Sequence, residues 1–343
     1  MKKERLIYFD IIKFIAVICV FTVHFTRTLE YFVGFDFKIL PDEIFGMYLG
    51  AFGVTLFFIT SGASLMYVYE EKLNLKEYFK KRFLGIYPLF WLTYIVAFMC
   101  NFYVNKGFDQ SIPKWRILFS VLGFDGTAAF FDTNFYQVGE WFLSVIILLY
   151  LLFPILRICV QKFPAISFAA SILVYIIIVQ NYSPANKLPL DCLVFARIPE
   201  FMFGMIFIRY MKKVNLKLFV PALAIMLASL FVDTSKFNSM YVITVVGISS
   251  FCVFAYLFYK VKDGIFKKIS LFISKYSYAI FLSHHFIMVL VIRHFIYCVM
   301  PKSEIIILYA MLWLITLLAS MGLVKLNGMI LNVFKKEKGN TPQ

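Results

Sequence analysis

Asp10, Lys13 and His24 are three ionisable residues within one apolar stretch near the start of the chain. In a helix of about 3.6 residues per turn, a separation of eleven residues leaves His24 about 20° from Lys13, and Asp10 about 40° from His24. The three side chains therefore share one face, with Lys13 and His24 about 16.5 Å apart along the axis. An imidazole can take a proton from a hydroxyl group, and an amine can bind an anionic group.

The stretch that carries these residues is apolar enough to cross a membrane, and the rest of the chain shares this character. Of the 343 residues, 62% are hydrophobic and 15% are charged, whereas soluble proteins average about 45–50% and about 25%. Such a composition excludes a soluble globular protein, a disordered chain and a disulfide-rich secreted scaffold. Because an ionisable side chain inside a membrane is costly, Asp10, Lys13 and His24 are candidates for function.

Ten apolar segments have about the length that a membrane-spanning helix needs, roughly 20 residues. Helices are expected because lipid satisfies no backbone hydrogen bonds. The sequence therefore predicts an all-α integral membrane protein, a bundle of about ten transmembrane helices, with one domain over residues 1–334 and a short polar cytoplasmic tail over 335–343. The predicted spans are about 6–26, 46–68, 84–103, 141–160, 165–180, 193–210, 217–233, 240–259, 276–299 and 305–326.

The basic residues give these spans an orientation. With both termini in the cytoplasm, most of the 34 Lys and Arg residues fall in cytoplasmic segments, as the positive-inside rule requires. This distribution explains the net charge of +15 as cytoplasmic flanks near anionic lipid, so membrane lipid is an expected partner and nucleic acid is not. The longest outer loop, about 104–140, is too apolar for a mere linker, and we expect it to fold as a re-entrant or capping element.

Further polar residues within or beside the spans are candidates for the wall of a site. Arg197 and Glu200 are three residues apart and can instead neutralise each other, just as Asp10 and Lys13 can form a structural pair while His24 caps an interface. The pair Ser61-Gly62 is more typical of helix packing than of a nucleophile. The six Cys are far apart, without zinc spacing, so no metal site is expected. The wall candidates are Ser61, Glu140, Trp141, Arg197, Glu200 and His284.

Six motifs in the same order resemble those of the membrane-bound acyltransferase-3 family, ten-helix O-acyltransferases that modify bacterial surface glycans. Lys13-x10-His24 is similar to the Arg/Lys-x10-His element of the family's first helix. Gly85 departs from the family pattern, because a second basic residue is usual at that position. The other similar segments are FFITSG at 57–62, KRFLGIYP at 81–88, WFL at 141–143 with Tyr150 and Pro154, RIPEFMFG at 197–204 and YAIFLSH at 278–284.

The resemblance implies a multi-pass protein of the bacterial cytoplasmic membrane that transfers an acyl group. The donor would be cytoplasmic acyl-CoA, in the first place acetyl-CoA, acting as co-substrate, with no tightly bound cofactor. The acceptor would be a hydroxyl of an extracytoplasmic glycan or of its lipid-linked precursor. Direct transfer and a covalent acyl-enzyme intermediate both stay open.

The same resemblance gives the candidate residues their roles. His24 would be the base that takes the hydroxyl proton. Lys13 would steady the donor or balance Asp10. The basic segment Lys80, Lys81 and Arg82 would bind the phosphates of coenzyme A.

A transporter or flippase for lipid-linked sugars or small solutes is the alternative function. A polar stripe inside a ten-helix bundle is equally typical of a permeation path. Such carriers often contain inverted repeats and helices broken at matching positions, and the sequence shows neither clearly.

Overall fold

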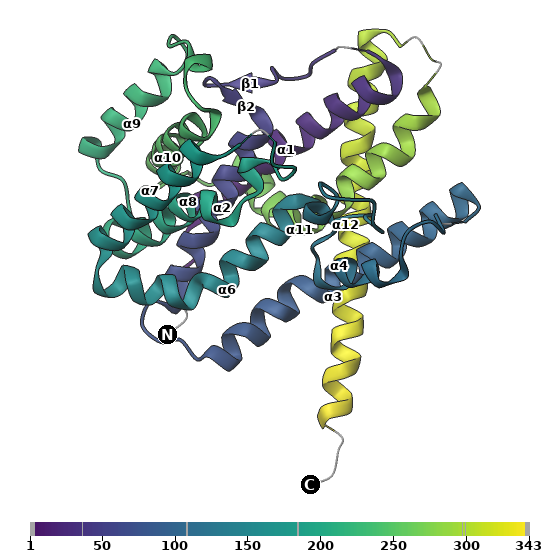
Figure 1. The fold of residues 1–343 in the computed structure, drawn as a ribbon, viewed down its shortest axis with the longest axis horizontal. Helices are drawn as coiled ribbons and strands as arrows, with labels where there is room; N and C mark the ends of the chain where they lie inside the picture. The colour runs from purple at the N-terminus through teal and green to yellow at the C-terminus, as the bar shows by residue number, and fades with distance from the viewer. Residues whose placement is uncertain are drawn as a thin grey trace. The chain divides into compact units, whose positions relative to one another are not determined.

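Helices make up nearly all of the regular structure in the computed structural model, which describes residues 4–339 apart from 36, 108, 184, 297 and 299 (Figure 1). Among these residues, the one sheet is a two-stranded antiparallel ribbon. Its strands are β1 (Glu43–Ile44) and β2 (Met47–Tyr48), with Glu43 opposite Tyr48. The predicted all-α fold class is confirmed.

Eight of the described helices are long and apolar enough to cross a membrane. Two other predicted spans correspond to the shorter helices α8 (Val194–Ile206), which a π-helical turn over Phe207–Met211 continues, and α9 (Leu216–Ala228). The count of ten spans and the cytoplasmic side of the termini therefore stay predictions. The eight long helices are α1 (Ile7–Val33), α2 (Leu49–Tyr69), α3 (Leu75–Asn105), α6 (Glu140–Lys162), α7 (Pro164–Asn181), α10 (Ser239–Leu257), α11 (Ile265–Ile292) and α12 (Lys302–Gly339).

Several helices are longer than the apolar segments that predicted them. Helix α3 begins at Leu75 and α11 at Ile265, in polar and basic sequence that precedes the predicted spans. Helix α12 continues to Gly339, through the first five residues of the predicted tail, and residues 340–343 lie outside the described part of the chain. The reason is that a helix satisfies its own backbone hydrogen bonds, so it need not end where the apolar run ends.

The chain divides into two compact units. Unit 1 comprises Met1–Val23, Lys38–Tyr78 and Trp141–Lys275, and unit 2 comprises His24–Phe37, Phe79–Glu140 and Tyr276–Gln343. In unit 1, helix α8 packs against α2 and α7, and α10 packs against α2 and α9 (Figure 1).

Two glycines allow a close helix crossing in unit 1, between α2 and α8. A Cβ atom at Gly62 would lie 2.0 Å from the carbonyl oxygen of Phe201, and one at Gly204 would lie 2.0 Å from that of Ile59. Small residues let two membrane helices approach to backbone contact. The structure thus agrees with the packing role predicted for Ser61-Gly62.

Gly204→Ala is expected to lower the stability of the protein by about 1–3 kcal/mol or more, because the new methyl group can be accommodated only if the backbone of α2 moves. The measurement is the apparent Tm and the monodisperse fraction of the protein in detergent. Gly328→Ala in helix α12 is the matched control, since a Cβ there meets no atom within 4 Å. Equal Tm values for the two variants would contradict the proposed crossing.

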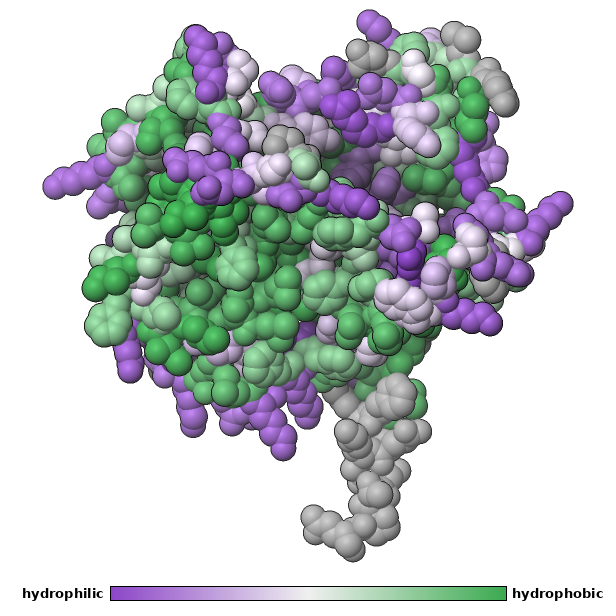
Figure 2. All heavy atoms as spheres, in the orientation of Figure 1, coloured by the Kyte–Doolittle hydropathy of each residue, from purple (hydrophilic) through white to green (hydrophobic). Residues whose placement is uncertain are grey.

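The outer surface of unit 1 is suited to lipid. Figure 2 shows a broad apolar face over the helices of this unit, with hydrophilic side chains gathered along two opposite edges. On α7, Ile166 is 70% exposed and Leu173 is 59% exposed. Apolar surface this extensive is unusual on a soluble monomer, and together with the long apolar helices it identifies a multi-pass membrane protein.

In unit 2, the outer loop predicted to fold does so against helix α3. The loop contains the short helices α4 (Ile117–Leu122) and α5 (Asp125–Ala128). Trp91 of α3 donates its indole N–H to the carbonyl of Val121 at 2.9 Å, and the hydroxyl of Tyr94 donates to the carbonyl of Phe135 at 2.6 Å. These bonds hold the loop against α3, and its role as a re-entrant or capping element over the outer face stays a prediction.

Candidate active site

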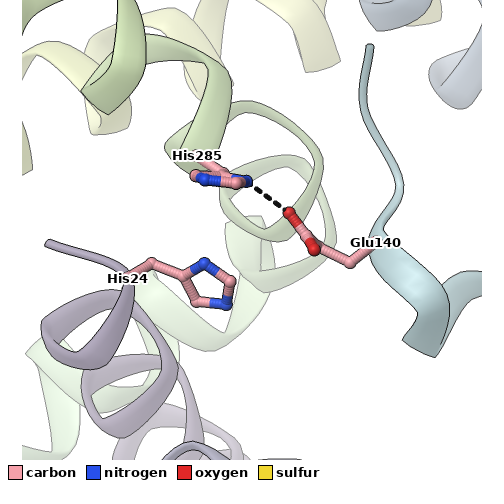
Figure 3. Close-up of side chains that lie close together, drawn as sticks. All are labelled: His24, Glu140 and His285. Carbon is pink, nitrogen blue, oxygen red and sulfur yellow. Dashed lines mark hydrogen bonds and ion pairs between the residues drawn. The ribbon is translucent and has the colours of Figure 1, made fainter. Parts of the chain in front are cut away.

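Two histidines and a glutamate from three helices gather in unit 2 (Figure 3). His285 of α11 donates its Nδ1–H to Oε1 of Glu140, the first residue of α6, at 2.6 Å. The ring of His24 on α1 points toward this pair, with its centroid 5.0 Å from that of His285. We call His24, Glu140 and His285 the histidine–glutamate cluster.

Helix α12 supports the two helices that carry the histidines of this cluster. Tyr309 of α12 packs its ring edge-on against Phe25, which follows His24, at a centroid distance of 5.1 Å. Ser320 of α12 lies 3.3 Å, hydroxyl to hydroxyl, from Ser283, two residues before His285. Both histidines therefore project from helices fixed to a common neighbour.

Glu140 is held in a strained backbone conformation. Its φ is +34°, in the region that residues with a side chain rarely adopt, and it follows Gly139 with φ +104°. Such a conformation costs on the order of 1–3 kcal/mol and persists only where the surroundings enforce it. The phenol of Tyr136 lies near the same carboxylate. Burial, and then this carboxylate, hold the pKa of Tyr136 well above its usual range.

This geometry suits proton transfer. Because Nδ1 of His285 donates to Glu140, its Nε2 is left as the acceptor of a neutral ring. A carboxylate that orients an imidazole and stabilises its charged form is the arrangement used to activate hydroxyl nucleophiles. The side chains of His285 and Glu140 are 38% and 17% exposed, so a substrate can reach them.

His284, predicted from the sequence to lie in the wall of the site, packs behind the cluster. It is 1% exposed, and its Nδ1 lies 2.9 Å from the carbonyl oxygen of Ile280 one turn earlier in its own helix. Its ring meets that of His24 edge-on at a centroid distance of 4.9 Å. This contact fixes the orientation of the His24 ring.

The histidine–glutamate cluster also has the composition of a metal site. The ligand atoms of His24, Glu140 and His285 all lie within 4.8 Å of one another. No metal was expected from residue spacing, and spacing along the chain carries no information about ligands from three separate helices. The hydrogen bond between His285 and Glu140 joins two of the candidate ligand atoms directly, so a metal would have to replace it.

Asp10 and Lys13 lie in unit 1, at a cavity of about 620 Å³ near the start of α1. Asp10 accepts two hydrogen bonds from Arg5, at 2.8 and 2.9 Å, and one from the hydroxyl of Ser274 at 2.7 Å. The bond to Asp10 raises the pKa of the Arg5 guanidinium. Arg5 and Ser274 thus hold Asp10, and Lys13 lines the cavity together with Lys72.

Arg197 and Glu200 form an ion pair in the core of unit 1. Both side chains are fully buried, and the guanidinium Nη1 donates to Oε1 of Glu200 at 2.9 Å. Thr55 and Thr244 donate to the same oxygen, each at 3.3 Å. The centroid of the Trp141 ring lies 5.7 Å from the guanidinium carbon. From their spacing, Arg197 and Glu200 could either line a site or neutralise each other. The structure shows them as a buried ion pair.

The remaining predicted site residues lie apart along the chain. Ser61 is partly exposed on α2, beside the Gly62 crossing. Lys80 and Lys81 are exposed and Arg82 is half-buried near the start of α3, in unit 2. Gly85 one turn later has open space where a side chain would be.

His285 and Tyr136 are absent from the site predicted from the sequence. One signal in the sequence could have pointed to this cluster. With both termini in the cytoplasm, the predicted orientation puts the end of the first span and the start of the fourth on the outer side. His24 and Glu140 are then expected at a similar depth. His285, in the predicted ninth span, faces them. Tyr136 lies in an irregular segment where the sequence has no periodicity to place a side chain.

Comparison with known proteins shows the family of the chain. No curated protein and no solved structure matches the chain. A family model, that of the acyltransferase domain of the acyltransferase-3 family, matches residues 6–324 and so covers the membrane helices, the cavity at Lys13 and the histidine–glutamate cluster. The chain belongs to the acyltransferase-3 family and is a membrane acyltransferase.

Proposed function

We propose that the protein is an O-acetyltransferase of the bacterial cytoplasmic membrane. It moves an acetyl group from cytoplasmic acetyl-CoA to a hydroxyl of an extracytoplasmic glycan or of its lipid-linked precursor. The observation that carries this proposal is the histidine–glutamate cluster, because a sugar hydroxyl is a poor nucleophile until a base takes its proton.

In the proposed reaction, His24 takes the proton of the acceptor hydroxyl as the oxygen attacks the thioester carbonyl. The new C–O bond forms, the C–S bond breaks, and the proton passes from His24 to the departing thiolate of coenzyme A. The Glu140 carboxylate, held by its hydrogen bond with His285, stabilises the positive charge that develops on the imidazoles. No covalent acyl-enzyme is needed for this balance.

The cavity at Lys13 is the proposed site of the donor. Coenzyme A carries several negative charges, and Lys13, Arg5 and Lys72 bring cations to this cavity beside the carboxylates of Glu4, Asp10 and Glu71. Lys80, Lys81 and Arg82, which belong to unit 2, stay the residues that the sequence proposes for the phosphates of coenzyme A. Lys13 and His24 belong to the single continuous helix α1, with a rise of about 16.5 Å between them, a distance suited to the long, narrow arm of coenzyme A.

Lys13→Ala is expected to raise the KM for acetyl-CoA by roughly 10-fold or more, since a hydrogen bond to a charged group contributes about 1.5–3 kcal/mol. Lys13→Arg keeps the charge and should lose less. Initial rates with labelled acetyl-CoA in inside-out vesicles give both values. Lys76→Ala, an exposed lysine on α3 of unit 1, is the control. Equal losses in Lys13→Ala and Lys13→Arg would point to a shape-specific role for the lysine instead of a charge.

Chelation is expected to leave the transferase rate unchanged. The reason is that Oε1 of Glu140 already accepts the proton of His285 at 2.6 Å, which gives the cluster its proton-transfer geometry without an ion. The measurement is the rate before and after treatment with EDTA or 1,10-phenanthroline, with metal content measured in parallel. Loss of activity that added zinc restores would make His24, Glu140 and His285 ligands instead of a base and its positioning pair.

One experiment separates the proposed enzyme from a carrier. Membranes that contain the protein are incubated with labelled acetyl-CoA, and the glycan is analysed by mass spectrometry for acetyl esters. Acetylated glycan that depends on His24 supports the proposal. Counterflow of an intact sugar without acetyl exchange would indicate a transporter.

A further inference from the structure

Besides the cavity at Lys13 in unit 1, a polar cavity lies in unit 2, between the end of α3 and the segment that leads to Glu140. Its volume is about 470 Å³, within the range of roughly 300–1,000 Å³ typical of small-molecule sites. Four amide side chains line it: Asn101, Asn105, Asn134 and Gln137. The rings of Phe98 and Phe135 also contribute to its wall. We call it the amide cavity.

We propose that the amide cavity binds one uncharged sugar residue of the acceptor glycan. The inference rests on the proposed function and names the part of the acceptor that the enzyme recognises. A sugar ring offers hydroxyl groups that both donate and accept hydrogen bonds, together with apolar C–H faces. Amide groups match the first property because each carries a donor and an acceptor, and aromatic rings match the second.

The charges at the amide cavity favour a neutral ligand. Lys106 and Asp109 bring one charge of each sign, and the Asp109 carboxylate accepts from the backbone N–H of Ser111 at 2.8 Å and from its hydroxyl at 2.6 Å. An anionic acceptor such as a phosphate-linked polymer would meet no excess of positive charge. An uncharged polyhydroxyl compound brings no charge that would have to be balanced by the cavity.

The amides are oriented before a ligand binds. Asn101 donates its Nδ2–H to Oε1 of Gln137 at 2.5 Å. This bond links α3 to the segment between α5 and α6. It leaves Oδ1 of Asn101 as an acceptor and Nε2 of Gln137 as a donor for the ligand. Side chains held in this way lose less conformational freedom when a ligand binds.

The amide cavity and the carboxylate of the active site belong to one short stretch of chain. Gln137 is three residues before Glu140. Oδ1 of Asn134 accepts a hydrogen bond from the backbone N–H of Tyr136 at 2.9 Å. The phenol of Tyr136 in turn lies near the Glu140 carboxylate. A sugar bound at Gln137 is therefore held by the same segment that positions the proton-transfer group.

The test replaces the two paired amides by apolar residues of similar size, Asn101→Leu and Gln137→Leu, in the full-length protein. Binding of methyl β-D-glucopyranoside and of methyl N-acetyl-β-D-glucosaminide is measured by saturation-transfer difference NMR, with glycerol phosphate and phosphocholine as charged probes. We expect the wild-type protein to bind at least one neutral glycoside and each variant to bind it roughly 3- to 10-fold more weakly. Gln110→Leu, an exposed amide in the same loop, is the matched control and should bind like the wild type.

The same proteins are assayed for acetyl transfer and for acetyl-CoA hydrolysis, which separates two kinds of failure. The expected pattern is a raised KM for the glycoside with an unchanged KM for acetyl-CoA, which also shows that the variants are folded. Variants that bind the glycoside as the wild type does would overturn the sugar site, as would a wild type that binds only phosphocholine, the mark of a lipid-headgroup site. Glycoside binding that needs Asn101 and Gln137 but leads to no acetyl transfer would instead contradict the proposed reaction and leave the sugar site standing.

Discussion

His24→Ala should reduce acetyl transfer by about two to four orders of magnitude, the contribution typical of a positioned general base. The imidazole of His24 is the ring that faces the bonded pair of His285 and Glu140 (Figure 3), and alanine leaves no group there to accept the hydroxyl proton. The amount of protein in the membrane should not change. Labelled acetyl-CoA and purified membranes give the rate, and immunoblotting gives the amount of protein.

Three further variants make this result specific. His294→Ala removes an exposed histidine just after helix α11 in the same unit and should keep full activity. Glu140→Gln keeps the shape of the side chain but removes its charge, so a partial loss is expected. His285→Ala should also lose activity, because it removes the partner of Glu140. If His24→Ala kept its rate while His285→Ala lost all activity, the base would be His285.

The helices were predictable because apolar length is a direct physical requirement for crossing lipid. Each of the ten predicted segments corresponds to a helix, and α1 carries Lys13 and His24 without interruption. What hydropathy could not give were the helix ends in polar sequence, such as the start of α3 at Leu75, because backbone hydrogen bonds continue a helix outside the apolar run. Helices α8 and α9 are shorter than the spans predicted for them. In both, apolar sequence continues beyond the end of the regular helix, so hydropathy alone placed the helix end too late.

Partners across the fold were harder to predict than the residues themselves. Asp10 and Lys13 are neighbours on one helix face, yet Asp10 binds Arg5 and Ser274, and Ser274 is 264 residues away along the chain. Helical spacing reports only on a residue's own helix. The His285–Glu140 bond joins the start of one helix to the middle of another, and no periodicity in a single sequence encodes such a contact.

Glu200→Leu is expected to lower the stability of the protein more than Gly204→Ala does. It removes the fully buried carboxylate paired with Arg197. The guanidinium then keeps the carbonyl of Asp191 at 2.8 Å and the carboxylate of Asp191 only at 3.9 Å. Removing one partner of a buried ion pair typically costs about 3–5 kcal/mol, because an uncompensated charge is left behind. The apparent Tm in detergent should fall by on the order of 10 °C, and expression should fall with it.

Replacing both partners is the decisive comparison for this ion pair. Arg197→Leu/Glu200→Leu leaves no buried charge, so its Tm should recover most of the loss seen in Glu200→Leu. Asp263→Asn breaks the pair with Lys267, in which the aspartate side chain is 91% exposed, and should leave the Tm unchanged because water screens such a pair. A double variant as unstable as Glu200→Leu would mean that shape and hydrogen bonds at Thr55, and not charge balance, hold this core. Recovery of the Tm together with full activity would place Arg197 and Glu200 in the scaffold of unit 1 and outside the chemistry, as their burial indicates.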